Sequence, residues 1–193
     1  TYSEIRLQLG VLEKELWLYR ALNGRTIVFS KDIAEKSTTL TYGYDVALGI
    51  ASIIGKETAF GEAFHITSDE SYTWKEILEI YLDTIEKKTG MRPKVLLLDK
   101  SPHLEWIGAK WQVILDRYYN RRFDNSKIQQ YIDTSQFVRT ESGLISCLES
   151  FLCHPQFKKM GWGIQGTYDR ITGEWAPFSE ISIIKDCISY LLH

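Results

Sequence analysis

Residues 61–78 read GEAFHITSDESYTWKEIL, and this stretch decides the fold class. Residues 63–67 are short and mostly apolar, which predicts a buried strand. Thr73 and Glu76 then form a T-x-x-E capping box, in which each side chain satisfies a free backbone N–H group at the start of a helix. Apolar residues at positions 77, 80, 81 and 85 continue this helix, and Gly90 ends it just after residue 88. The stretch therefore predicts a strand, a polar loop and a helix.

The flanking sequence predicts further short elements of both kinds. Helical spacing of apolar residues, with glycine, proline or capping residues at the ends, indicates helices at residues 11–23, 45–54, 102–115, 125–131, 141–153 and 179–192. Runs of β-branched, aromatic and apolar residues indicate strands at residues 26–29, 40–42 and 95–98. The last of these follows the helix that begins at Thr73, an order that suits a β-α-β unit with the strand at 63–67. The sequence thus predicts an α/β chain that is rich in helix and has a few short strands.

Composition places the chain among globular proteins and argues against several functions. Its 193 residues, 44% of them hydrophobic, suffice for one domain with a sizeable core. A net charge of −2 argues against nucleic-acid binding, and no apolar run approaches the roughly 20 residues that span a bilayer. Because no signal-like segment opens the sequence and three cysteines are too few for a disulfide framework, we expect a reduced, cytoplasmic protein. Thr1 is not an initiator methionine, so we also expect a longer parent chain.

Several blocks of the sequence match one known family in order. They are residues 1–10, with Tyr2, Arg6, Leu9 and Gly10; residues 38–49, TTLTYGYDVALG; the stretch from Gly61; residues 123–128, FDNSKI; and residues 141–155 with their trailing His-Pro. Together they resemble the extended short-chain dehydrogenase/reductases of the NAD-dependent epimerase/dehydratase group. The resemblance implies that residues 1–193 are the C-terminal, substrate-binding part of such an enzyme, a helix-rich lobe that lacks most of the Rossmann sheet. It also implies that residues 38–67 return to that missing sheet.

The comparison with this family also identifies what the chain lacks. The family moves a proton through a tyrosine of lowered pKa with a lysine four residues on, and it moves a hydride to a nicotinamide. No tyrosine here has a lysine at that spacing; Tyr2 and Tyr118 have Arg6 and Arg122 instead, which we interpret as ordinary surface arginines. The family's glycine-rich nucleotide loop is also missing. We therefore expect no catalytic residue in this chain, a parent enzyme that uses NAD or NADP, and a segment that alone is inactive and binds no cofactor.

The position of each motif in the family suggests binding residues. Tyr2 resembles the turn that passes beside the nicotinamide, and it is the expected cofactor contact. Anionic groups of a nucleotide-sugar or sugar substrate approach the FDNSKI block in relatives, since a helix start with basic side chains attracts phosphate. The alternative is that Asp124 or Asn125 caps a helix and the basic side chains face water. The expected substrate-binding residues are Arg121, Arg122, Asn125 and Lys127.

One departure from the family affects the substrate. Members that bind UDP-sugars carry an arginine just before the aspartate that corresponds to Asp45, and this chain has threonines there. The sequence therefore does not predict a standard UDP-sugar site.

Two other motifs fit ordinary structure better than a ligand. Residues 161–166, GWGIQG, match the dinucleotide fingerprint G-x-G-x-x-G, but no strand precedes them and no helix clearly follows. We interpret them as a turn that contains tryptophan. Cys147, Cys153 and His154 lack the close pairing of zinc ligands, so no metal site is expected.

Three functions stay open on the sequence alone. The first is the substrate-binding part of an epimerase or dehydratase, and the second is a non-catalytic interaction or oligomerisation module derived from the same family. The third is a small enzyme that uses its own carboxylates, but the sequence has no pair of acidic residues at a useful spacing for catalysis. Strand edges without neighbours predict a partner, either the missing N-terminal half or another copy in a homo-oligomer. The upstream gene sequence distinguishes the first two functions.

Overall fold

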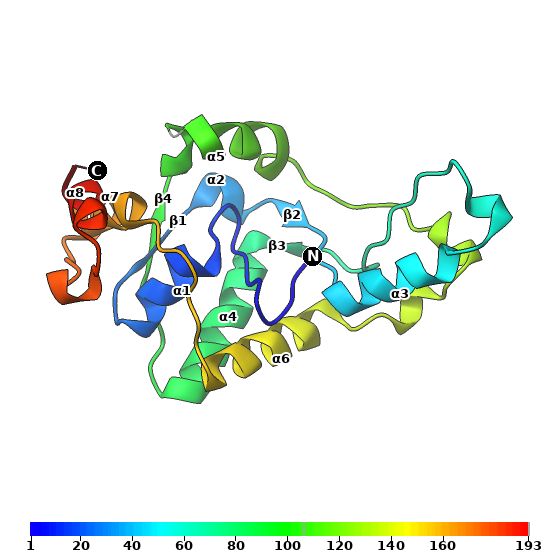
Figure 1. The fold of residues 1–193 in the computed structure, drawn as a ribbon, viewed down its shortest axis with the longest axis horizontal. Helices are drawn as coiled ribbons and strands as arrows, with labels where there is room; N and C mark the ends of the chain where they lie inside the picture. Colours follow the sequence, from blue (N-terminus) through cyan, green and yellow to red (C-terminus); the bar gives the residue numbers. More distant parts are fainter. Residues whose placement is uncertain (106, 193) are drawn as a thin grey trace.

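The computed structural model describes residues 1–105 and 107–192 (Figure 1). The first elements are α1 (Lys14–Leu22), β1 (Ile27–Ser30), α2 (Lys31–Ala34), β2 (Ser37–Thr38), α3 (Gly43–Ile53) and the 3₁₀ turn η1 (Glu57–Ala59). The middle elements are β3 (Tyr72–Thr73), α4 (Trp74–Thr89), β4 (Val95–Leu98), the 3₁₀ turn η2 (Pro102–Leu104), α5 (Ile107–Gln112) and the π-helical turn η3 (Val113–Arg117). The last elements are the 3₁₀ turns η4 (Ile128–Gln130) and η5 (Thr134–Gln136), α6 (Thr140–Cys153), α7 (Trp162–Thr172), the 3₁₀ turn η6 (Phe178–Glu180) and α8 (Ile184–Leu192). A helix-rich chain with small sheets confirms the predicted fold class.

The strands form two small pairs in the described part of the chain. β1 and β4 are parallel, with Ile27 opposite Val95 and Ser30 opposite Leu98, and β2 pairs with β3 antiparallel. The strand predicted at 95–98 is therefore confirmed, but its partner is β1. Residues 63–67, predicted as a strand, pair with no described segment, and their place in the missing sheet stays a prediction.

Helix α4 has the boundaries that its local sequence predicts. The Thr73 hydroxyl accepts a hydrogen bond from the Glu76 N–H group at 3.2 Å, and the Glu76 carboxylate accepts one from the Thr73 N–H group at 2.6 Å. At the other end Gly90 has φ 76°, a left-handed conformation that glycine adopts without strain. The predicted capping box and helix stop are thus confirmed.

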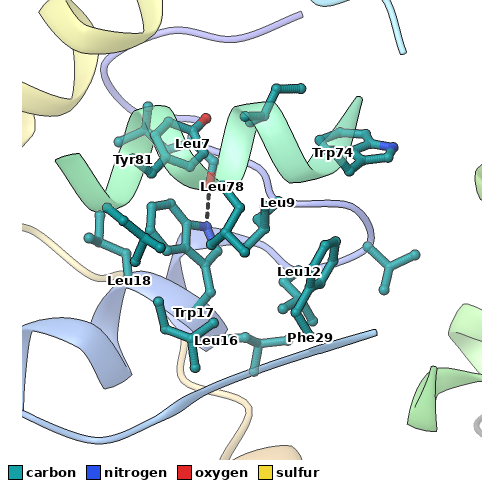
Figure 2. Close-up of a cluster of buried hydrophobic side chains, with 14 of the residues drawn as sticks. Leu7, Leu9, Leu12, Leu16, Trp17, Leu18, Phe29, Trp74, Leu78 and Tyr81 are labelled. Atoms are coloured by element: carbon teal, nitrogen blue, oxygen red, sulfur yellow. Dashed lines mark hydrogen bonds between the residues drawn. The ribbon is translucent and has the colours of Figure 1, made fainter. Parts of the chain in front are cut away.

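The main core lies between α1, α4 and the N-terminal segment (Figure 2). Trp17 stacks on Tyr81 with ring centroids 4.6 Å apart, and its indole N–H donates to the Leu7 carbonyl at 3.0 Å. Gly10, with φ 60°, lets the same segment pass the Phe29 ring, since a Cβ atom there would lie 2.9 Å from that ring. These contacts fix residues 1–10 against the body of the protein.

Helix α3 projects from the body, at the opposite end from α7 and α8 (Figure 1). The sequence predicted a helix packed on more than one side, but of its residues only Asp45 and Gly49 are buried. Leu48 and Ile50 are 40% and 48% exposed, and Ile54 and Phe60 just beyond the helix are exposed still further. An apolar helix is normally covered on several sides, so the exposed apolar surface of α3 is unusual.

The C-terminal helices correct two predictions. Residues 161–166 are not a turn, because α7 begins at Trp162, directly after Gly161. A Cβ atom at Gly166 would lie 2.2 Å from the Tyr190 carbonyl oxygen, so glycine here permits the close contact of α7 with α8. The helix predicted from residue 179 begins only at Ile184, since η6 forms a separate turn.

Two other predicted helices are not continuous α-helices in the structure. The helix predicted at 102–115 is divided into η2, α5 and η3, and that predicted at 125–131 is reduced to η4. In the part of the chain that the structure describes, no helix has both the length and the apolar character needed to cross a membrane.

Candidate functional site

Arg6, Arg117 and Arg121, which we call the arginine cluster, lie beside the start of the chain. Burial, followed by the charges of Arg6, Arg121 and Arg117, lowers the pKa of the Thr1 amino group. Positive charges lower the pKa of an amino group only from nearby. The three guanidinium groups therefore lie close enough to the Thr1 amino group to act on its charge.

Arg121 is held against β2. Its backbone N–H donates to the Ser37 carbonyl at 2.9 Å, and its Nη2 donates to the Thr38 hydroxyl at 2.7 Å. Nη1 pairs with the Asp116 carboxylate at 2.6 Å. Its buried Nε has no hydrogen-bond partner among the described residues, so one donor of the guanidinium is unused.

Arg117 and Arg6 complete the cluster. Arg117 is buried, donates from Nε to the Gly10 carbonyl at 2.9 Å and pairs with Asp116, so that a single carboxylate serves both Arg117 and Arg121. Arg6 is half exposed, and the one ion pair of its side chain with the described residues is a 3.8 Å contact with Glu13. Sequence reasoning missed Arg117 and interpreted Arg6 as an ordinary surface residue. The available signal was the presence of three arginines within residues 117–122.

Asn125 joins two segments of the chain. Its Oδ1 accepts hydrogen bonds from the Thr67 N–H group and hydroxyl at 3.3 and 3.0 Å. Its Nδ2 donates to the Thr67 carbonyl at 2.6 Å and to Asp69 at 2.8 Å. These bonds use the full capacity of a carboxamide. Asn125 thus positions residues 67–69, and a direct contact with substrate stays a prediction.

The other predicted substrate residues are on the surface. Lys127 pairs with Glu62 and lies 5.0 Å from the centroid of the Phe64 ring. Arg122 is exposed and forms no ion pair or hydrogen bond with the described residues. Asp124 accepts a hydrogen bond from the Ser126 N–H group at 2.8 Å, but η4 begins only at Ile128 and has no side-chain cap, so neither Asp124 nor Asn125 caps it. Substrate binding by Lys127 and Arg122 stays a prediction.

Tyr2, the predicted cofactor contact, lies beneath α6. Its backbone pairs with Thr41 and Gly43, and its ring is buried against Gly143, with a hydroxyl that has no partner among the described residues. Burial raises the pKa of the Tyr2 phenol. Proton exchange near neutral pH requires a lowered tyrosine pKa, so this phenol is unsuited to that step. A contact between Tyr2 and a cofactor stays a prediction.

Two further features bear on ligands. Asp45 lies in the first turn of α3, as its motif predicts, and accepts a hydrogen bond from the Val138 N–H group at 2.9 Å. Burial raises the pKa of its carboxyl group. Among residues 1–105 and 107–192, no group of three or more histidine, cysteine or acidic side chains has the arrangement of a metal site.

The fold is similar to two solved structures of one enzyme. One is UDP-glucuronic acid 4-epimerase from Bacillus cereus in complex with NAD, with 17% identity, 73% of this chain and 39% of that chain covered, and a TM-score of 0.51. The other is the same enzyme in complex with UDP-glucuronic acid and NAD, with 18% identity, 72% and 38% covered, and a TM-score of 0.51. No family model matches the sequence, and no curated protein matches it.

The likeness covers a limited part of the epimerase. The chain spans only 39% and 38% of the solved structures that it matches. Identities of 17% and 18% support a common fold, and activity and substrate need separate support. At the level of the fold the expectation from the sequence is confirmed: the chain has a helix-rich fold that is similar to part of UDP-glucuronic acid 4-epimerase.

Proposed function

We propose that this chain is the substrate-binding part of an NAD- or NADP-dependent epimerase or dehydratase that acts on a nucleotide sugar. The observation that carries the proposal is α3, an apolar helix with few buried residues in a fold similar to part of an epimerase. Exposed apolar surfaces of this kind mark sites of interaction with another polypeptide. In this proposal the cover is the N-terminal Rossmann half of the parent enzyme, to which residues 38–67 return.

The chemistry of the parent comes from that N-terminal half. The sequence contains no tyrosine with a lysine four residues on, and the raised pKa keeps the Tyr2 phenol protonated. This segment alone is therefore inactive and binds no nicotinamide. In the parent, NAD or NADP supplies reversible hydride transfer with the sugar.

The arginine cluster is the contact for the phosphate groups of the nucleotide. Arg117 and Arg121 share Asp116, so the positive charge exceeds the negative charge there. Arginine suits such a ligand, because its planar fork donates two parallel hydrogen bonds to a phosphate. Arg121 reaches Thr38, at the block where the local sequence lacks the arginine of UDP-sugar-binding relatives. In this proposal the positive charge of Arg121 replaces that of the missing arginine, so the site can bind a nucleotide diphosphate.

The other predicted residues have supporting roles. Arg122 and Lys127 are basic side chains at the protein surface that add electrostatic attraction for the phosphate groups at the edge of the site. Asn125 holds residues 67–69 in position. Tyr2 forms part of the wall next to the nicotinamide. Homo-oligomer formation and a cytoplasmic location stay predictions.

The longer protein encoded by the gene tests this proposal. We expect a glycine-rich nucleotide loop and a Tyr-x-x-x-Lys pair within roughly 170 residues before Thr1. The purified longer protein should then convert a UDP-sugar in the presence of NAD or NADP, while the 193-residue chain should not.

The competing function is the non-catalytic module. An upstream sequence without the loop and the pair, together with no turnover of UDP-sugars, would favour it. The exposed face of α3 would then bind another protein instead of a Rossmann half.

A further inference from the structure

A cavity of about 590 Å³ lies between the C-terminal helices and the body of the protein. Its apolar wall consists of Val11, Leu16, Ala109, Met160, Trp162 and Ile164. Cavities of roughly 300–1,000 Å³ hold most small ligands. Because α7 and α8 lie at the opposite end of the molecule from α3 (Figure 1), this cavity is separate from the surface that the proposed function assigns to the Rossmann half.

The wall formed by α7 is held in place from behind. Asp169 of α7 pairs with Arg20 of α1 at 2.5 Å and with Arg25 at 3.2 Å, and the side chains of Asp169 and Arg20 are completely buried. Gln165 donates to the Glu15 carbonyl at 3.0 Å, which joins the same two helices. The lining is therefore positioned without a ligand, and a preformed site loses less conformational entropy on binding.

The charges in the lining balance. Among the described lining residues the ionisable side chains are Lys159 and Asp186, which carry opposite charges, and His103. His103 is buried, with its Nε2 2.5 Å from the Tyr168 hydroxyl, and burial lowers the pKa of this imidazole to about 4. His103 is thus neutral at physiological pH. A mostly apolar lining without net charge favours a ligand that is itself neutral and largely apolar, since apolar surface cannot replace the hydration of a charged group.

We propose that this cavity binds a neutral, largely apolar small molecule. The size of the cavity, its preformed walls and its apolar lining together carry the proposal. It is independent of the proposed enzyme function, because it involves neither the arginine cluster nor α3.

Titration of the 193-residue chain with the neutral fluorescent probe 1-aminoanthracene tests the proposal. We expect saturable binding at one site. Ala109→Trp fills the cavity from α5 and Ser189→Phe fills it from α8, and each should weaken binding by at least about tenfold. Circular dichroism checks that each variant is folded, and the two variants lie on different walls, so that either one alone can decide the outcome.

Two surface variants serve as controls. Ile184→Ser on α8 and Leu48→Ser on α3 remove apolar side chains that are exposed outside the cavity, and they should leave the affinity unchanged. Three results would overturn the proposal. The first is unchanged affinity in the folded cavity-filling variants, and the second is loss of binding in the surface variants. The third is no saturable binding of either 1-aminoanthracene or the second neutral probe, N-phenyl-1-naphthylamine.

Discussion

Replacement of Asp169 by alanine should loosen the packing of α7 on α1. The buried carboxylate accepts hydrogen bonds from Arg20 at 2.5 Å, Arg25 at 3.2 Å, the Tyr190 hydroxyl at 2.6 Å and the Ala176 N–H group at 3.0 Å. Removal of one partner of a buried ion pair costs about 3–5 kcal/mol, since the other charge stays buried without its partner. In a chain of this size each kcal/mol lowers the melting midpoint by about 2–4 °C. The melting midpoint of Asp169→Ala should therefore be about 6–20 °C lower than that of the parent chain.

We expect a decrease in the lower half of this range, because other carboxylates lie near the two arginines. Glu174 lies 3.9 Å from Arg20, and Glu180 lies 3.2 Å from Arg25, so both arginines keep a partial counter-charge. The assay is thermal unfolding followed by circular dichroism. Asp99→Ala is the matched control, because Asp99 forms an exposed pair with Lys31 and its loss should leave the midpoint unchanged. An Asp169→Ala midpoint within about 2 °C of the parent chain would refute the reasoning.

Three further predictions concern a close contact, a titration and the proposed substrate site. A Cβ atom at Gly143 would lie 2.0 Å from the Tyr2 hydroxyl, so Gly143→Ala should lower the free energy of unfolding by about 1–3 kcal/mol in urea titrations. Addition of Tyr2→Phe removes that hydroxyl but leaves the ring carbon Cζ 2.8 Å from the added Cβ atom, so it should restore part of the loss; a double variant no more stable than Gly143→Ala would contradict this. Burial lowers the pKa of His103 to about 4, below the unfolded value of about 6.5, so the unfolded chain binds the proton first and stability falls as the pH decreases from about 6.5 to 4. His103→Gln should lack this part of the pH dependence, about 3 kcal/mol, and identical pH profiles of the two proteins would show that the pKa is not lowered. In the longer protein, Arg121→Ala should raise KM for the nucleotide sugar by about 10- to 100-fold, since a charge-assisted hydrogen bond contributes about 1.5–3 kcal/mol. Arg92→Ala on the exposed surface is its control in the same initial-rate assay, and an unchanged KM for Arg121→Ala would remove this residue from the site.

The elements that sequence could predict are those with local signals. Helix α4 is the clearest case, because Thr73, Glu76 and Gly90 each act within a few residues of the helix end that they define. Strand β4 was also predicted correctly from its apolar composition. Its pairing with β1 was not, since that choice depends on residues distant in the sequence.

The remaining elements depend on contacts that a single sequence does not reveal. Gly163 and Gly166 weaken helix propensity, yet packing on α8 stabilises α7 across them. Residues 63–67 have the composition of a strand but no described neighbour with which to pair. The candidate site shows the same limit, because the position of Arg117 depends on the Gly10 carbonyl, which is remote in the sequence.

The claim that another polypeptide covers α3 is tested most directly by amide hydrogen exchange of Gly43–Ile53. The measurement compares the isolated chain with the longer protein that contains the upstream half. We predict that in the isolated chain these amides exchange much faster than those of α4, and that the upstream half slows their exchange by at least about tenfold. Equal protection of α3 in the two proteins would contradict the account.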